Sequence, residues 1–194
     1  MASDELRRAD ARPIGVFDSG VGGLTVLRAL RAALPHESFV YLGDTARLPY
    51  GTKSGHTVAR YALQAADELV GRGIKCLVVA CNTASAAALP ALRERHAGLP
   101  VLGVIEPGAR AACEASASGH IAVLGTEATV RAGAYRQAIG SLRPGALVTE
   151  IACPLFVALA EEGWTEGDVP RAAAARYLAP LGAAAGGTPD TIVL

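Results

Sequence analysis

The chain has 194 residues, which is enough for one large domain or two small ones with a substantial core. Hydrophobic residues make up 51% of it and charged residues 19%, which argues for a globular protein rather than a disordered one. The 18 basic and 18 acidic side chains cancel and no basic run stands out, so neither nucleic acid nor an anionic membrane surface is expected as a main partner.

The amino-terminal segment differs in composition from the rest of the chain. Its first dozen residues, MASDELRRADAR, are charged and lack the apolar core of a signal peptide, so we predict a disordered leader over residues 1–12. No apolar run reaches the length of a transmembrane helix. We therefore expect a cytoplasmic protein with no membrane partner.

Beyond the leader, short β-branched runs alternate with segments rich in Ala, Leu and Arg. This pattern predicts strands at 13–19, 38–44, 74–81, 99–105, 120–126 and 146–153, and helices at 23–34, 56–73, 83–98 and 128–142. Such alternation predicts an α/β fold in which mainly parallel strands are flanked by helices. Ligands bind such sheets at the carboxyl ends of the strands, so the residues just after each strand are the first candidates for a site.

The turns after the first two predicted strands carry polar residues. In FDSGVGGLTV, Asp18 and Ser19 end an apolar strand, and three glycines would let a ligand approach the backbone. The spacing does not match the GxGxxG dinucleotide fingerprint, and a purely structural turn is the alternative. The second turn, YLGDTARLPYGTKS, adds Asp44, Tyr50 and Gly51.

The third turn, in VVACNTAS, is the strongest local candidate for chemistry. It places Cys81, Asn82 and Thr83 between a buried strand and a helix. Amide N–H groups at the start of a helix favour a thiolate, and Asn82 and Thr83 could bind a carboxylate there. The alternative is an Asn/Thr helix cap beside a buried thiol.

Later turns add hydroxyls and one further thiol. VLGTEAT contributes Thr126 and Thr129, whereas Cys153 in IACPLF precedes a proline and is interpreted as a structural thiol. No CxxC pair or His/Cys cluster has metal-ligand spacing, so no metal site is predicted. The only lysines are Lys53 and Lys75, which leaves a pyridoxal Schiff base without an obvious position.

The chain also contains a weak internal repeat. IGVFDSG from Ile14 is similar to IAVLGTE from Ile121, FVYLGD to LVTEIA, and KCLVV from Lys75 to DTIVL from Asp190. Such similarity can arise by chance between strands of an α/β protein. If it is genuine, the chain has two halves of similar construction with a boundary near 105–117.

Taken together, these segments resemble one known family. GVFDSGVGGLTV, YLGDTARLPYGTKS, VVACNTASAAALPALR, GVIEPG, VLGTEATVRAGAY and ACPLFVALAEEG occur in the order and spacing of glutamate racemases, the cofactor-independent branch of the Asp/Glu/hydantoin racemase group. The resemblance covers about 13–194. It implies two pseudo-symmetric α/β domains, at 13–104 and 105–194, with the active site between them.

The resemblance also implies roles for residues of this chain. It makes Cys81 the first catalytic cysteine, with Asp18 beside it in the site. The substrate would be bound by Asp18, Ser19, Tyr50, Gly51, Asn82, Thr83, Thr126 and Thr129, and the supporting acidic residues would be Asp44 and Glu161.

The implied activity is interconversion of L- and D-glutamate by two cysteines, without a cofactor, which supplies D-glutamate for peptidoglycan. The small-molecule partner is then glutamate, and a homodimer is left open. In the family the second cysteine lies in a GCTH motif after a strand like DTIVL. This chain ends before that motif, so we expect a second domain that is incomplete and a chain whose own activity is uncertain. The alternatives are a racemase of another acidic amino acid, such as aspartate, and a non-catalytic fragment or binding module.

Overall fold

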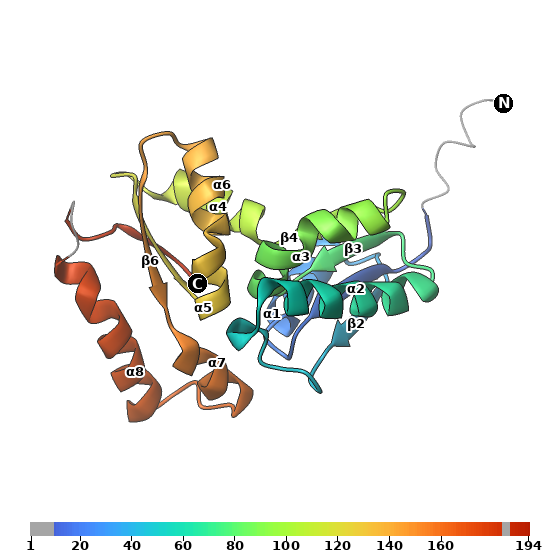
Figure 1. Cartoon of the computed structure of the whole chain (residues 1–194), viewed down its shortest axis with the longest axis horizontal. Helices are drawn as coiled ribbons and strands as arrows, with labels where there is room; N and C mark the ends of the chain where they lie inside the picture. The colour runs from blue at the N-terminus through green and yellow to red at the C-terminus, as the bar shows by residue number, and fades with distance from the viewer. Residues whose placement is uncertain (1–9, 184–186) are drawn as a thin grey trace.

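The computed structural model describes residues 10–183 and 187–194. It contains two parallel β-sheets, each flanked by helices, and the two sheets with their helices lie side by side in Figure 1. We call residues 10–104 the first half and residues 105–194 the second half. Most of the leader predicted at 1–12 lies outside the described residues. Of its last three residues, Arg12 forms an exposed ion pair with Asp10.

The first half is built on a four-stranded sheet. Its strands are β1 (Ile14–Asp18), β2 (Phe39–Gly43), β3 (Cys76–Val79) and β4 (Val101–Gly103), in the order β2-β1-β3-β4. Its helices are α1 (Leu24–Ala33), α2 (Gly55–Gly71) and α3 (Asn82–Arg95), with a short 3-10 turn, η2, at Tyr50–Thr52.

Side chains alternate between the two faces of this sheet. Phe17, Leu77 and Val79 are fully buried in the cluster that contains the apolar faces of α2 and α3. Val16 and Val78 point the other way and pack with the partly buried side chains of α1. Because both faces are covered, these strands are apolar along their whole length, as is typical of parallel sheets.

The second half is built on a three-stranded sheet. Its strands are β5 (His120–Gly125), β6 (Leu147–Ala152) and β7 (Thr191–Val193), in the order β6-β5-β7. Its helices are α4 (Ile105–Ala115), α5 (Glu127–Ala132), α6 (Ala134–Leu142), α7 (Pro154–Glu161) and α8 (Asp168–Leu178), followed by a 3-10 segment, η3, at Ala179–Ala183.

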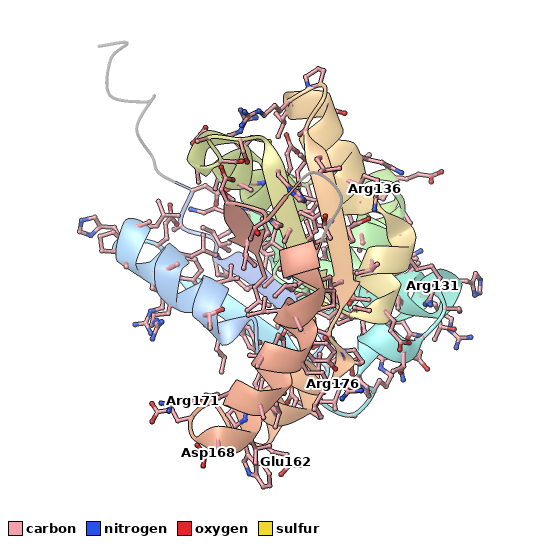
Figure 2. All side chains as sticks on the ribbon, turned by 90° about the vertical axis from the view of Figure 1, so that its left-hand side faces the viewer. Arg131, Arg136, Glu162, Asp168, Arg171 and Arg176 are labelled. Atoms are coloured by element: carbon pink, nitrogen blue, oxygen red, sulfur yellow. The ribbon has the colours of Figure 1, made fainter. Side chains whose placement is uncertain are left out.

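The helices of the second half form two layers. Side chains of α4 and α6 enclose Ile121 and Val123 of β5 on one face of the sheet. Helix α8 forms the outer layer, and Figure 2 shows it nearest the viewer with Arg171 and Arg176 along it. Only Ala173 of α8 is buried, and Tyr177 near the end of the helix packs edge-on against Phe156 of α7.

The two sheets repeat the same arrangement. β1 and β5 are central, and Ile14 pairs with Cys76 of β3 as Ile121 pairs with Thr191 of β7. This is the register expected from the match of KCLVV with DTIVL. The predicted fold class, two pseudo-symmetric α/β units with parallel sheets, is therefore confirmed.

Several predicted elements differ from those observed. The strand expected at 99–105 ends at Gly103, and Ile105 already begins α4. Helices α4 and α8 were hidden by prolines, which both helices accommodate within the first turn. The helix expected at 128–142 is divided at Gly133, whose φ of 63° is left-handed and ends α5. Within the described residues, no helix has both the length and the apolar character needed to span a bilayer.

Candidate active site

The carboxyl ends of the two sheets face each other where the halves meet. β1 ends at Asp18, β3 leads to Cys81, and β5 leads to Thr126. Hydrogen bonds join Thr83 of the first half to Thr126 and Thr129 of the second. The parallel topology places Asp18 and Cys81 at one edge of the first sheet, and the contact between the halves brings Thr126 to them.

Cys81 lies at the first turn of α3. It is the N-cap residue, and its Sγ accepts a hydrogen bond from the N–H of Ala84 at 3.4 Å. The thiol in turn donates to Ser19 Oγ, also at 3.4 Å. Only 7% of Cys81 is exposed, so the sulfur contacts a ligand only within an enclosed site.

The electrostatics of Cys81 differ from the expectation of a favoured thiolate. Burial raises the pKa of the Cys81 thiol, and the negative charge of Asp18 raises it further. The hydrogen bond with Ser19 and the one from the N–H of Ala84 lower it, the latter as predicted for the start of a helix, but they act less strongly. Local sequence could show the helix terminus but not the degree of burial, and burial dominates.

The carboxylate of Asp18 stabilises the turn that follows β1. Its Oδ2 accepts hydrogen bonds from the N–H of Gly23 at 2.9 Å and of Gly20 at 3.2 Å, with the Tyr41 hydroxyl at 3.4 Å. Gly23 is required by this packing, since a Cβ there would lie 2.6 Å from Asp18 Cβ. The turn therefore fixes the carboxylate beside Ser19 and Cys81.

Tyr50 is placed differently from a residue that binds substrate through its hydroxyl. Its ring is 1% exposed and belongs to the core of the first half. The hydroxyl donates to Asp44, whose carboxylate is also paired with Arg47 Nε at 2.7 Å. Burial is the largest cause of the raised pKa of Tyr50, so this phenol stays protonated. Asp44 and Tyr50 thus brace the loop that carries Gly51.

Gly51 and the threonines form the contact between the halves. A Cβ on Gly51 would lie 2.5 Å from Thr126 Cβ, so glycine permits the close approach. Three hydroxyls then form a triangle: Thr83 to Thr126 at 2.8 Å, Thr126 to Thr129 at 3.0 Å, and Thr83 to Thr129 at 3.2 Å. Thr126 also caps α5, accepting from Thr129 N–H at 3.2 Å.

Glu161, at the end of α7, reaches the first half. Its Oε1 accepts from the N–H of Val21 at 3.5 Å, and a Cβ on Gly20 would lie 2.4 Å from this oxygen. A cavity of about 270 Å³ lies beside this contact, lined by Gly51, Thr126 and Glu161 among others. Glu161 therefore lies at the same junction, although it forms no hydrogen bond to Cys81 or Ser19.

Sequence reasoning missed three residues with contacts to this site: Tyr41 on Asp18, Arg47 on Asp44, and Tyr135. Tyr135 donates to Asn82 Oδ1 at 2.8 Å from the second half. Its presence in the quoted segment VLGTEATVRAGAY was the available signal. Among residues 10–183 and 187–194, no group of three or more His, Cys, Asp or Glu side chains is placed to hold a metal ion.

Comparison with known sequences decides the family. The sequence model described as Asp/Glu/Hydantoin racemase matches residues 22–194. The chain belongs to this family. It is 56% identical over 183 residues to a glutamate racemase of Geobacter metallireducens, covering 94% of this chain and 66% of that protein. A glutamate racemase of Aquifex aeolicus is 50% identical over 181 residues, covering 93% of this chain and 68% of that protein.

Solved structures of family members have the same fold. The crystal structure of glutamate racemase from Francisella tularensis in complex with D-glutamate superposes with a TM-score of 0.83 at 39% identity, covering 89% of this chain and 65% of that one. The racemase isoform RacE1 from Bacillus anthracis also gives 0.83, at 37% identity, over 91% and 66%. The chain thus spans about two thirds of the length of the family members it matches.

Proposed function

We propose that the protein is a glutamate racemase that interconverts L- and D-glutamate, with Cys81 as the base on one face of the α-carbon. The observation that carries the proposal is the position of Cys81: a buried thiol at a helix N-terminus, between Ser19 and the Asn82–Thr83 pair. The names of the relatives support the substrate, because those aligned over nearly all of this chain are glutamate racemases. We further propose the domain division at 13–104 and 105–194.

The environment of Cys81 suits removal of a weakly acidic proton. A thiolate whose pKa is raised is a stronger base once it has formed, which favours attack on the α-proton of an amino acid. Amide N–H groups at the start of α3 would stabilise the charge that develops on the α-carboxylate. In this proposal Asn82 and Thr83 bind that carboxylate, and no cofactor takes part.

The remaining predicted residues have supporting roles in this proposal. Thr126 and Thr129 contribute hydroxyls from the second half, and Ser19 holds the sulfur through its hydrogen bond. Gly51 lets the loop approach Thr126. Asp18, Asp44, Tyr50 and Glu161 act by fixing the turns and the loop around the substrate.

Inversion also needs a proton donor on the opposite face of the α-carbon. In the glutamate racemases that the chain resembles, a second cysteine follows a strand like β7. β7 lies beside β5 as β3 lies beside β1, so a residue that follows β7 would approach the substrate from the second half. The proposed product, D-glutamate, would serve peptidoglycan synthesis in the cytoplasm.

Deuterium exchange tests the two-base proposal. We expect the polypeptide of residues 1–194, incubated with D-glutamate in deuterated water, to exchange the α-proton through Cys81 without changing the optical rotation. If the natural protein continues past Leu194 into a segment with a second cysteine, that full-length protein should exchange and invert together. Sustained interconversion of the enantiomers by residues 1–194 alone would contradict the requirement for a second base.

The family also includes racemases of aspartate and hydantoins, as its description states. Turnover of glutamate and aspartate by the full-length protein separates these substrates. A ratio of kcat/KM that favours aspartate would overturn the substrate assignment while leaving Cys81 as the base.

A further inference from the structure

The side chain of Asn82 can face a ligand in two orientations. Its amide has an acceptor end, Oδ1, and a donor end, Nδ2, which differ by a half-turn about the last bond. Only the donor end binds a carboxylate favourably. Asn82 is the first residue of α3 and is partly exposed, so backbone geometry alone does not fix which end faces the site.

Tyr135 makes a contact that selects one orientation. This residue belongs to α6 in the second half, and its hydroxyl donates to Asn82 Oδ1 at 2.8 Å. The tyrosine is 4% exposed, and burial raises its pKa to about 12. It therefore keeps its proton at neutral pH. Among the hydrogen bonds of the described residues, none uses Asn82 Nδ2.

Gly108 makes room for that hydroxyl. It lies in α4, which packs against α6 in the second half. A Cβ at position 108 would be 3.1 Å from Tyr135 Oη and 3.3 Å from Tyr135 Cε1. The glycine of GVIEPG and the tyrosine of VRAGAY thus meet at one point, although neither segment supplies a residue to the proposed chemistry.

We propose that Tyr135 is a positioning residue, which orients the Asn82 amide so that Nδ2 faces the substrate carboxylate, and that Gly108 provides the space for it. The inference rests on the proposed function, in which Asn82 binds that carboxylate. Under this proposal, a residue of the second half orients a carboxylate-binding residue of the first half.

The opposite orientation is disfavoured for two reasons. Turning the amide would place Nδ2 against the tyrosine oxygen, and the buried phenolic proton would then lose its acceptor. It would also point Oδ1 at the substrate carboxylate, so that two acceptors face each other. Both effects act in the same direction, and both depend on a hydroxyl at position 135.

Equilibrium binding of glutamate tests the inference in a Cys81→Ser background of the full-length protein, where the ligand is not turned over. We expect Tyr135→Phe, which keeps the ring and removes the hydroxyl, to raise the Kd about threefold to tenfold. Asn82→Ala should raise it by about tenfold or more, since it removes a hydrogen bond to a charged group. Adding Tyr135→Phe to Asn82→Ala should then change the Kd no further.

Tyr177→Phe is the matched control. The Tyr177 hydroxyl accepts from the N–H of Leu155 at 3.1 Å in the same half, away from Asn82. Its removal should leave the Kd unchanged, whatever it does to the melting temperature. If Tyr135→Phe does not fold, Gly108→Ala replaces it, because the new methyl must displace the Tyr135 hydroxyl. It should raise the Kd about twofold, and only while Asn82 is present.

The outcomes distinguish the positioning role of Tyr135 from the carboxylate-binding role of Asn82. If Asn82→Ala weakens binding but Tyr135→Phe does not, or if the two effects multiply, Tyr135 does not act through Asn82 and the inference is overturned while the carboxylate site stands. If Asn82→Ala leaves the Kd unchanged, the carboxylate role of Asn82 is wrong and the inference fails with it.

Discussion

β3 and β7 occupy the same place in their sheets, yet their surroundings differ. β3 lies between β1 and β4, and its Leu77 is fully buried. β7 pairs with β5 alone among the described strands, and Ile192, the counterpart of Leu77 in the repeat, is 51% exposed. An apolar strand sequence therefore does not by itself determine how much a residue contributes to the free energy of unfolding, because that contribution depends on whether neighbouring strands lie on both sides.

The two sheets also differ in the functional groups at their carboxyl edges. The first sheet supplies a thiol beside a carboxylate, from Cys81 and Asp18, whereas the described edge of the second supplies the hydroxyls of Thr126 and Thr129 and the thiol of Cys153, which donates to the carbonyl of Ile151. Among the described residues, the thiol with a carboxylate beside it therefore lies in the first half. The described residues of the second half supply hydroxyl donors and contact surface.

The largest expected effect follows from this division. Cys81→Ser in the full-length protein should lower kcat about 10²–10⁴-fold, since a serine hydroxyl cannot replace the thiolate as base. Cys153→Ser, in the turn after β6, should retain activity within a few-fold because its thiol only donates weakly to the carbonyl of Ile151. Racemisation followed by polarimetry distinguishes them. Equal losses in both variants would remove the special role of Cys81.

Alanine substitution of Leu77 and Ile192, which are equivalent in the repeat, compares the two sheets directly. In the polypeptide of residues 1–194, Leu77→Ala should lower the free energy of unfolding by about 2–5 kcal/mol, as expected for a fully buried leucine. Ile192→Ala should lower it by less than about 1 kcal/mol, since half of the side chain is already in water. Urea unfolding of both variants measures the difference. Similar losses would show that β7 is covered as fully as β3.

A smaller effect concerns the charge beside the thiol. Asp18→Asn keeps an oxygen acceptor for Gly20 and Gly23 but removes a negative charge that raises the pKa of Cys81. That pKa should fall, so at a fixed pH near 8 more thiolate is present. Alkylation of Cys81 by iodoacetamide should then proceed several-fold faster, because the thiolate is the reactive form.

Glu161→Gln is the comparison from the second half. Glu161 is not among the groups that mainly shift the pKa of Cys81, so its substitution should change the alkylation rate less than Asp18→Asn does. The measurement is the pH profile of labelling at Cys81, followed by peptide mapping. A profile that moves to higher pH in Asp18→Asn would contradict the assigned sign.

The sequence was sufficient for features that depend on local order. Strand ends in a parallel sheet share one edge, which is why Asp18 and Cys81 could be grouped without coordinates. Thr126, which follows a strand of the other sheet, was grouped with them through the family resemblance. The sequence could not predict the contacts between the two halves. Nothing near Tyr135 shows that it meets Asn82, and nothing near Tyr50 shows that its hydroxyl is engaged by Asp44 within the core.

Burial was the other quantity that local sequence could not provide. The helix N-terminus at Cys81 was predicted correctly, but the pKa of its thiol depends mainly on how completely water is removed. The division of the helix predicted at 128–142 has a local cause instead, because Gly133 adopts a left-handed backbone conformation that ends α5. Tertiary packing thus overrides a correct local signal at Cys81 but not at Gly133.

The triangle of Thr83, Thr126 and Thr129 has a property that single hydrogen bonds lack. Each hydroxyl can donate to one neighbour and accept from the other, so the ring can circulate in either sense with no movement of oxygen or carbon. A ligand carboxylate that accepts a hydrogen bond from one member would open the ring into a chain, in which the two remaining donors still point along it. Rotation of one O–H bond would then exchange a contact within the triangle for one with the ligand, and every hydroxyl proton would keep an acceptor.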